Sequence, residues 1–292
     1  MPTTVRPRRS VLYMPGANTR ALEKGRTLPA DGLILDLEDS VAPDAKGEAR
    51  TNIIAALAEG GYGNREILVR VNALETPWGR DDIAALAGCG ADALLLPKVE
   101  SAEHVREADA LMADNGAPAD MALWCMMETP RAMLRAEEIA GASPRLGGFV
   151  MGTSDLAKDL GCAHTPDRLP MLTSLGLCVL AAKAEGLAIL DGVLLDLSDD
   201  EGFEAACRQG ADMGFDGKTL IHPKTIEAAN RVFAPSEEDI AWSEKIIAAH
   251  AEAEKDGKGI VLVDGKLIEN LHVESARRLV AMAAMIKEAE AP

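Results

Sequence analysis

Eight short apolar runs recur along the chain, and segments with helical spacing of their apolar residues lie between them. The runs cover residues 10–16, 32–41, 66–72, 93–99, 122–127, 147–151, 188–196 and 213–223. Strands that alternate with helices form parallel sheets, and eight such units predict an α/β fold, a (β/α)8 TIM barrel with functional groups at the carboxyl ends of its strands. A doubly wound open sheet is the main alternative. It is disfavoured because neither GxGxxG nor GxxxxGK[ST] follows the first strand.

The stretch from Met126 to Gly161 shows this unit most clearly. Two apolar runs, ALWCMM and GGFVM, flank the segment RAMLRAEEIAG, which has the spacing of one helix. Pro130 stops the first run just after Glu128, and the cluster Gly152–Ser154 stops the second run just before Asp155. A crossover of this length makes the two strands parallel. We therefore expect Glu128 and Asp155 to emerge at the same edge of the sheet.

Two carboxylates at one edge repel each other unless a cation lies between them. Oxygen ligands without His or Cys nearby favour a hard ion, and two carboxylates leave positions for water and substrate oxygens, as Mg²⁺ prefers. Glu128 and Asp155 are therefore candidate Mg²⁺ ligands, with Mn²⁺ as an alternative ion. The competing interpretation, the commoner one for a single carboxylate, is that Glu128 is solvated and that Asp155 caps a helix beginning at Leu156.

Further charged and polar side chains lie at the ends of the predicted strands: Asp36, Glu38, Asp39, Arg70, Asn72, Lys98, Asp216, Lys218 and His222. Arg70 is the most informative, because an arginine inside an apolar strand is costly unless it meets an anion. That anion is either a protein carboxylate from the cluster 36–39 or a substrate carboxylate, and the substrate is favoured. We expect Lys98 to be solvated or in a supporting ion pair, and His222 to be structural.

The composition limits the partners and the compartment. A formal charge of −17 argues against nucleic acid as a partner, because a polyanion needs a basic surface. An anionic substrate would need a local cluster of Arg, Lys or helix N-termini. The five cysteines form no CxxC pair, which indicates reduced thiols. No apolar run is long enough to span a membrane or to form a signal segment, so we expect a cytoplasmic protein.

Residues 236–292 lie outside the eight units and divide the chain into a catalytic barrel, 1–235, and a C-terminal extension. The extension is predicted to contain a helix over 236–259, a hairpin through Asp264 and Gly265, and a helix over 275–291. It is too small to be an independent domain. We expect it to act as a lid that packs on the barrel or on a neighbouring subunit.

Several segments together resemble one known family: RRSVLYMPGAN, LILDLEDSVAPDAKGEAR, VRVN, LPKVE, METPRA, MGTSDLAKDLG, GFDGKTLIHP and VDGKLIEN. They are similar to the HpcH/HpaI aldolase and citrate lyase β-subunit family, in the branch of malyl-CoA and citramalyl-CoA lyases and (3S)-malyl-CoA thioesterases. The resemblance covers nearly the whole chain. It implies a TIM barrel, commonly a homotrimer or a hexamer of trimers, with Mg²⁺ held by Glu128 and Asp155.

The resemblance also implies roles for other residues. Arg70 would hold the carboxylate or thioester side of the substrate, and Glu38 and Asp39 would support the metal through water. The backbone at Gly152, Thr153 and Ser154 would cradle a carboxylate. Coenzyme A, as part of the substrate, would cross the mouth of the barrel near the following residues, the last two as phosphate contacts: Tyr13, Asn18, Arg20 and Lys24.

The branch implies a Mg²⁺-dependent carbon–carbon lyase. A 3-hydroxyacyl-CoA with a carboxylate beside its hydroxyl chelates the ion through both oxygens, which lowers the pKa of the hydroxyl. Loss of that proton breaks the carbon–carbon bond and releases a 2-oxo acid and the enolate of acetyl- or propionyl-CoA. Arg70 is the expected donor to the enolate oxygen. The reverse condensation uses the same groups.

The tail departs from the family pattern. Related chains usually carry an Asp in this segment as a catalytic acid/base supplied across a subunit interface, and GKLIEN here has Glu269. Glu is one methylene longer, and a small displacement has a large effect on rate. We therefore give nearly equal weight to a second activity, in which the thioester of (3S)-malyl-CoA is hydrolysed to malate and CoA. A citrate lyase β subunit that works with an acyl-carrier protein is a third, disfavoured alternative, because a tail that completes a neighbour's site suits a self-sufficient homo-oligomer.

Overall fold

The computed structural model describes residues 5–255, 257 and 259–290 of the chain. These residues form two compact units. The barrel unit comprises Arg8–Phe233, and the C-terminal unit comprises the residues from Ala234 onward together with residues 5–7. No helix within the described ranges combines the length and the apolar character that a membrane crossing needs.

The barrel unit is built on eight parallel strands in sequence order: β1 (Ser10–Pro15), β2 (Gly32–Asp36), β3 (Glu66–Arg70), β4 (Ala93–Leu96), β5 (Ala122–Met127), β6 (Leu146–Met151), β7 (Ala188–Asp191) and β8 (Gly217–Leu220). The sheet closes because β8 pairs in parallel with β1, with Ser10 opposite Lys218. The predicted TIM barrel is confirmed, and the open sheet is wrong.

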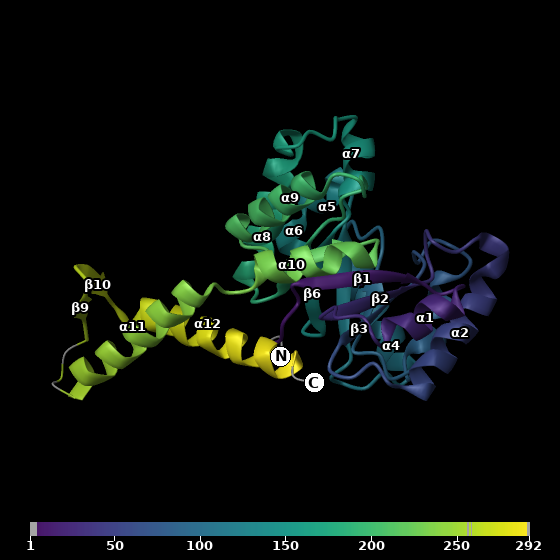
Figure 1. Cartoon of the computed structure of the whole chain (residues 1–292). Helices are drawn as coiled ribbons and strands as arrows, with labels where there is room; N and C mark the ends of the chain where they lie inside the picture. The colour runs from purple at the N-terminus through teal and green to yellow at the C-terminus, as the bar shows by residue number, and fades with distance from the viewer. Residues whose placement is uncertain (1–4, 256, 258, 291–292) are drawn as a thin grey trace. The chain divides into compact units, whose positions relative to one another are not determined.

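Helices connect the strands and surround them (Figure 1): α1 (Thr19–Gly25), α2 (Lys46–Glu59), α3 (Gly79–Leu86), α4 (Ala102–Asp114), α5 (Pro130–Leu134), α6 (Ala136–Ala140), α7 (Thr153–Leu160), α8 (Leu172–Ala184), α9 (Asp200–Met213) and α10 (Ile226–Phe233). Short 3₁₀ helices precede three of them: η1 (Pro43–Ala45), η2 (Leu169–Met171) and η3 (Pro223–Thr225). The single helix expected between β5 and β6 is instead two, because the backbone leaves helical geometry at Arg135, where φ is −119° and ψ is 16°.

Six strands are shorter than predicted, and the differences are largest at β2, β7 and β8, the first two of which end at an aspartate. Asp36 ends β2, and its carboxylate accepts the backbone N–H groups of Glu38 at 2.9 Å and Ser40 at 3.1 Å. Asp191 ends β7, and its Oδ1 accepts the N–H of Gly192 at 2.8 Å. In both cases the aspartate carboxylate accepts backbone N–H groups of the residues that follow it. These groups would otherwise bond to a neighbouring strand, so the strand ends there. The third of these strands is β8, which ends at Leu220.

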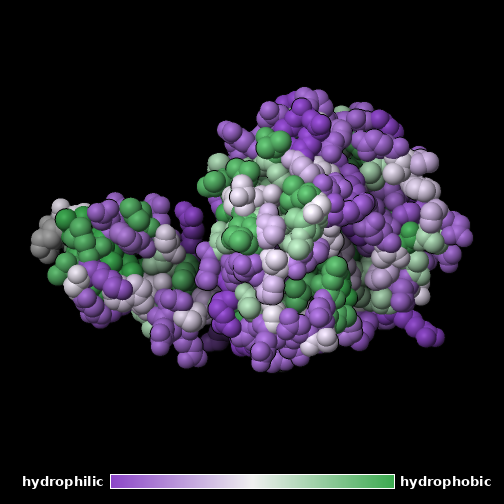
Figure 2. All heavy atoms as spheres, turned by 90° about the horizontal axis from the view of Figure 1, so that it is seen from above, coloured by the Kyte–Doolittle hydropathy of each residue, from purple (hydrophilic) through white to green (hydrophobic). Residues whose placement is uncertain are grey.

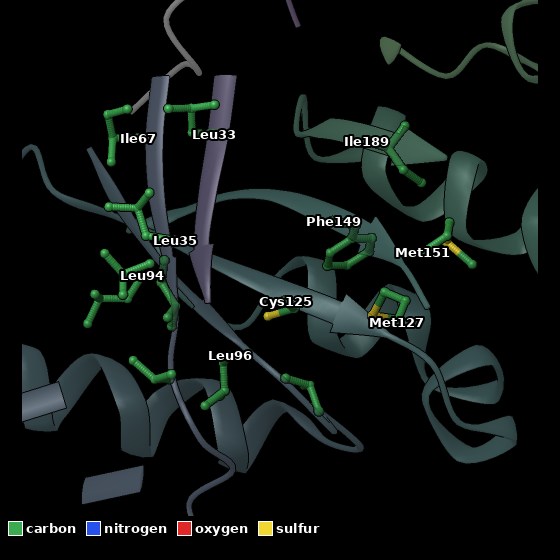
Figure 3. Packing of buried hydrophobic residues seen from close by; sticks show 14 of the residues in the cluster. Leu33, Leu35, Ile67, Leu94, Leu96, Cys125, Met127, Phe149, Met151 and Ile189 are labelled. Carbon is green, nitrogen blue, oxygen red and sulfur yellow. The ribbon is translucent and has the colours of Figure 1, made fainter. Parts of the chain in front are cut away.

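Two apolar layers hold the barrel together. Leu33, Leu35 and other outward residues of the strands pack against the helices (Figure 3). Inward residues such as Ile34 and Trp124 fill the interior. Trp124 fits there because β6 carries Gly148, where a Cβ would lie 2.6 Å from the indole Cζ3. The predominantly aliphatic core follows from a sequence with few aromatic residues.

The C-terminal unit contains α11 (Glu237–Lys255), β9 (Val261–Val263), β10 (Lys266–Ile268) and α12 (Asn270–Ala289). Asp264 and Gly265 have φ of 49° and 78°, as a two-residue hairpin turn requires, so the predicted hairpin is confirmed. Its inner side packs in a small core with Ile246 of α11. Its outer side exposes Leu262 and Leu267, and Figure 2 shows hydrophobic surface on this unit, at the left of the view.

Candidate functional site

A cavity of about 360 Å³ lies at the carboxyl ends of the strands. Strands β1, β2, β3, β5, β6 and β8 and the segments that follow β2, β5, β6, β7 and β8 line it, with these residues: Tyr13, Asp36, Asp39, Ser40, Arg70, Met126, Glu128, Met151, Gly152, Thr153, Ser154, Asp155, Val193, Leu195, Thr219 and Ile221. Functional groups of a TIM barrel gather at this end of the strands. The cavity therefore brings together most of the residues that the sequence predicted for the site.

Arg70 is the centre of an acidic cluster in this cavity. Its Nε and Nη2 form a fork with the two carboxylate oxygens of Asp36, at 2.6 and 2.8 Å. Its Nη1 lies 2.8 Å from Glu38 Oε2 and 3.4 Å from Asp39 Oδ2. The guanidinium also covers the ring of Tyr13 at 4.9 Å. The ion pair with the 36–39 cluster, which we favoured less, is thus formed, although Arg70 still lines the cavity.

The ionisable groups around Arg70 respond to burial in different ways. Burial alone would raise the pKa of Asp36, but the hydrogen bonds and charge of Arg70 hold that pKa below its ordinary value. Burial raises the pKa of Glu38 to about 7; Arg70 opposes this, and the charges of Asp39 and Glu128 reinforce it. Oε2 of Glu38 has no hydrogen-bond partner among the described residues, because its contact with Arg70 lacks hydrogen-bond geometry. This carboxyl group can therefore hold a proton near neutral pH.

Glu128 and Asp155 meet at a second charged cluster. Glu128 follows β5, is only 2% exposed, and accepts the backbone N–H of Lys98 on Oε1 at 2.8 Å. The ammonium of Lys98 lies 3.5 Å from the same oxygen and contacts Asp155 Oδ2. The structure thus brings the two carboxylates to one cation at the barrel mouth, as their sequence positions predicted, and Lys98 forms the supporting pair that we expected.

The turn at Gly152 sets the position of both carboxylates. Helix α7 begins at Thr153 with Gly152 as its N-cap, and Asp155 lies within its first turn. The alternative in which Asp155 caps a helix beginning at Leu156 is therefore wrong. A Cβ at Gly152 would lie 2.4 Å from the Cβ of Glu128 and 2.6 Å from its Oε2. Glu128 can occupy its place only because residue 152 has no side chain.

The donor set at this cluster fits a hard divalent ion. It offers two carboxylates that already share a single ammonium group. Across the part of the chain that the structure describes, no group of three or more His, Cys, Asp or Glu side chains is arranged to hold a metal. A metal bound here would thus have two protein ligands and would complete its shell with water or substrate, as suits Mg²⁺ better than Zn²⁺.

Other residues predicted for the site lie away from the cavity. Asn18 caps α1 by accepting the N–H of Ala21 at 3.1 Å, and Arg20 and Lys24 are exposed on that helix. None of them lines the cavity, and their contact with coenzyme A stays a prediction. His222 accepts the N–H of Lys224 at 3.1 Å, the structural role that we expected.

Glu269 belongs to the C-terminal unit. It precedes α12 as its N-cap residue, and its backbone N–H donates to Nδ1 of His272 at 3.1 Å. Its catalytic role stays a prediction.

Lys46 helps to position the acidic residues of the site, a role that the sequence did not reveal. It is buried at the start of α2, where its Nζ donates to the carbonyl oxygens of Leu37 and Glu38, both at 2.8 Å. These bonds hold the turn that carries Glu38 and Asp39. The available signal was a lysine on an amphipathic helix, and such a lysine is usually solvated.

Comparisons with known proteins place this site in a family. Residues 9–223 match the family model described as HpcH/HpaI aldolase/citrate lyase. A (3S)-malyl-CoA thioesterase from Cereibacter sphaeroides (strain KD131) is 53% identical over 96% of each chain. An L-malyl-CoA/β-methylmalyl-CoA lyase from the same species (strain ATCC 17025) is 36% identical over 98% of this chain and 97% of the lyase.

A solved structure shares the architecture. It is the protein CitE from Mycobacterium tuberculosis in complex with magnesium, acetoacetate and coenzyme A, with 29% identity, a TM-score of 0.76, and coverage of 96% of this chain and 99% of CitE. The similarity to these relatives extends through the barrel and the C-terminal residues. The chain therefore belongs to the HpcH/HpaI aldolase/citrate lyase family of enzymes.

Proposed function

We propose that the chain is a Mg²⁺-dependent (3S)-malyl-CoA thioesterase. The observation that carries this proposal is the 53% identity, over almost the full length of both chains, with a protein of that activity. The cavity is compatible with it, because a divalent ion on Glu128 and Asp155 would offset their negative charge more fully than the ammonium of Lys98 does and would favour an anionic substrate.

The metal would be held by Glu128 and Asp155, with Glu38 and Asp39 supporting it through water. Bound there, Mg²⁺ supplies Lewis acidity and neutralises negative charge. Mn²⁺ has the same preference for oxygen ligands and is an alternative.

Protein groups would orient the substrate and handle protons. Nε and Nη2 of Arg70 are held by Asp36. Arg70 would therefore bind the substrate through Nη1, which would exchange its contacts with Glu38 and Asp39 for the substrate. The N–H groups at Thr153 and Ser154, at the start of α7, would bind its carboxylate. In hydrolysis, water attacks the thioester carbonyl, the C–S bond breaks, and the sulfur leaves as the thiol with a proton. Glu269 would take the proton of the attacking water.

A carbon–carbon lyase is the second candidate, favoured by the 36% identity with an L-malyl-CoA/β-methylmalyl-CoA lyase. It would use the same cavity, with Arg70 donating to the oxygen of the acyl-CoA enolate. The products would be a 2-oxo acid and an acyl-CoA.

Product analysis separates the two activities. Purified protein is incubated with (3S)-malyl-CoA and Mg²⁺, and free thiol, malate and glyoxylate are measured separately. Equal amounts of free thiol and malate without glyoxylate support the thioesterase. Glyoxylate with acetyl-CoA and no free thiol refutes it in favour of the lyase. The variants Glu128→Gln and Asp155→Asn should each lose activity together with Mg²⁺-dependent thermal stabilisation, and unchanged turnover in both would refute the metal site.

The substrate's CoA moiety and the assembly are further parts of the proposal. CoA would lie near Tyr13 and Asn18, with Arg20 or Lys24 contacting phosphate. The extension would pack on a neighbouring subunit of a homotrimer or hexamer, and the exposed leucines of its hairpin support such packing. Light scattering gives the molar mass in solution and so tests the assembly, because the mass of a monomer would exclude a homotrimer or hexamer. The free state of all five cysteines, each within the described residues, is consistent with a cytoplasmic location.

A further inference from the structure

Lys98 occupies an unusual backbone position beside the carboxylate pair. It follows β4 and Pro97, and its φ of 53° lies in the left-handed region that residues with a side chain seldom adopt. This geometry points its N–H at Glu128 Oε1, at 2.8 Å. Strained backbone of this kind is retained where the surrounding structure requires it, often at a functional site.

The side chain of Lys98 contacts the same carboxylates as well. Its ammonium lies 3.5 Å from Glu128 Oε1 and contacts Asp155 Oδ2, so it sits between the two carboxylates. Arg70, which lines the cavity, is held by Asp36. Lys98 therefore offsets one of the two negative charges of Glu128 and Asp155.

The two contacts of Lys98 differ in how easily they can be released. The N–H contact is fixed by the backbone and does not depend on the type of side chain. The ammonium ends a flexible chain that is 37% exposed, so it can move into solvent without unfolding the barrel. A lysine near the surface gains little from such a pair, whereas a divalent ion between the same oxygens carries twice the charge.

We propose that the ammonium of Lys98 is an internal counter-ion that competes with the divalent metal for Glu128 and Asp155. It offsets part of the charge of the two carboxylates when the metal is absent and leaves when the metal binds, so it weakens metal affinity and preserves the empty site. The backbone N–H of Lys98 keeps Glu128 oriented in both states. This inference rests on the proposed function, because it takes these carboxylates to be the metal ligands.

Mg²⁺ titration calorimetry on the full chain, first stripped with a chelator, tests the competition. Lys98→Met removes the ammonium and keeps a long side chain, and Lys98→Asn removes it with a residue that tolerates positive φ. Each should bind Mg²⁺ about tenfold more tightly, or about 1.4 kcal/mol. The stripped variants should melt at a lower temperature than the stripped wild type, and the Mg²⁺-loaded proteins should melt alike.

Lys183→Met is the matched control. Lys183 pairs with one aspartate, Asp216, at 2.7 Å, and its side chain is 43% exposed. Asp216 precedes β8 and so lies at the opposite end of the barrel. This variant should leave the Kd for Mg²⁺ unchanged.

The outcomes separate this inference from the proposed function. If Glu128→Gln weakens Mg²⁺ binding and neither Lys98 variant tightens it, the competition is refuted and the metal site stands. Weaker Mg²⁺ binding in both Lys98 variants would refute it too, because the lysine would then help to hold the metal. If Glu128→Gln and Asp155→Asn leave the wild-type Kd unchanged, the metal site itself fails, and this inference fails with it.

Discussion

Replacing Gly152 with alanine should disable the site through a single methyl group. The Cβ would lie 2.4 Å from the Cβ of Glu128, whereas ordinary contacts begin at 3.4 Å, so one of the two must move by about 1.0 Å. The backbone does not resist the change, because φ of −95° and ψ of 72° at Gly152 lie outside the left-handed region. The added methyl group therefore acts through a steric clash, which displaces the side chain of Glu128.

The magnitude follows from that displacement. Misplacement of a catalytic group by about 1 Å costs roughly 100-fold in rate, equivalent to about 2.7 kcal/mol in the barrier. Overpacking of this kind costs about 1–3 kcal/mol of folding stability, which a barrel of this size can tolerate. We therefore expect Gly152→Ala to fold, to lose about 100-fold in kcat/KM, and to bind Mg²⁺ more weakly.

Three assays together decide this prediction. Circular dichroism establishes folding, thiol release from (3S)-malyl-CoA gives kcat/KM, and calorimetry gives the Kd for Mg²⁺. Gly176→Ala is the control, because a Cβ there meets no atom within 4 Å and alanine favours its helix by about 1 kcal/mol. If Gly152→Ala retains wild-type kcat/KM and Mg²⁺ affinity, Glu128 does not need its observed position, and the assignment of the site is refuted.

Three further predictions concern buried charges and the tail. Asp191→Ala removes the carboxylate shared by Arg168 and by Lys218, which is 1% exposed. This variant should lower the free energy of unfolding, measured in urea, by about 3–5 kcal/mol, and a loss below about 1 kcal/mol would contradict the prediction. Burial raises the pKa of Glu38 from 4.5 to about 7, so in metal-free protein the stability that it contributes is full below pH 4.5 and is lost as pH rises through 7. Glu38→Gln should flatten that dependence in denaturant unfolding at pH 5 and 8, and an unaltered slope would exclude a raised pKa. Glu269→Ala should lower turnover far more than acyl-CoA affinity, and a pure loss of affinity would make Glu269 a binding residue.

Much of the fold was predictable from local patterns. The alternation of apolar strands with helices has a short period and needs no knowledge of distant contacts, so all eight strands and the closed barrel followed from it. Their lengths did not. The runs 32–41 and 188–196 stay apolar or acidic beyond the true strand ends, and Asp36 and Asp191 end the strands by binding nearby backbone N–H groups.

The candidate site divides in the same way. The positions of Glu128 and Asp155 at one edge followed from the sequence, because parallel strands place their carboxyl ends together. The ion-pair partner of Arg70 did not follow from the sequence. Either a protein carboxylate or a substrate carboxylate can pair with an arginine, and the sequence does not distinguish the two.

The sequence by itself determined that this chain forms a barrel with a carboxylate pair at its mouth, because strand order and hydrophobic period specify which edge each residue reaches. Only the tertiary structure decided how those charges are balanced. The fork of Arg70 on Asp36, the hold of Lys46 on the turn at Glu38, and the place of Lys98 between two carboxylates each depend on distances of a few ångströms. Such distances arise from the packing of separate elements, and no local pattern in the chain encodes them.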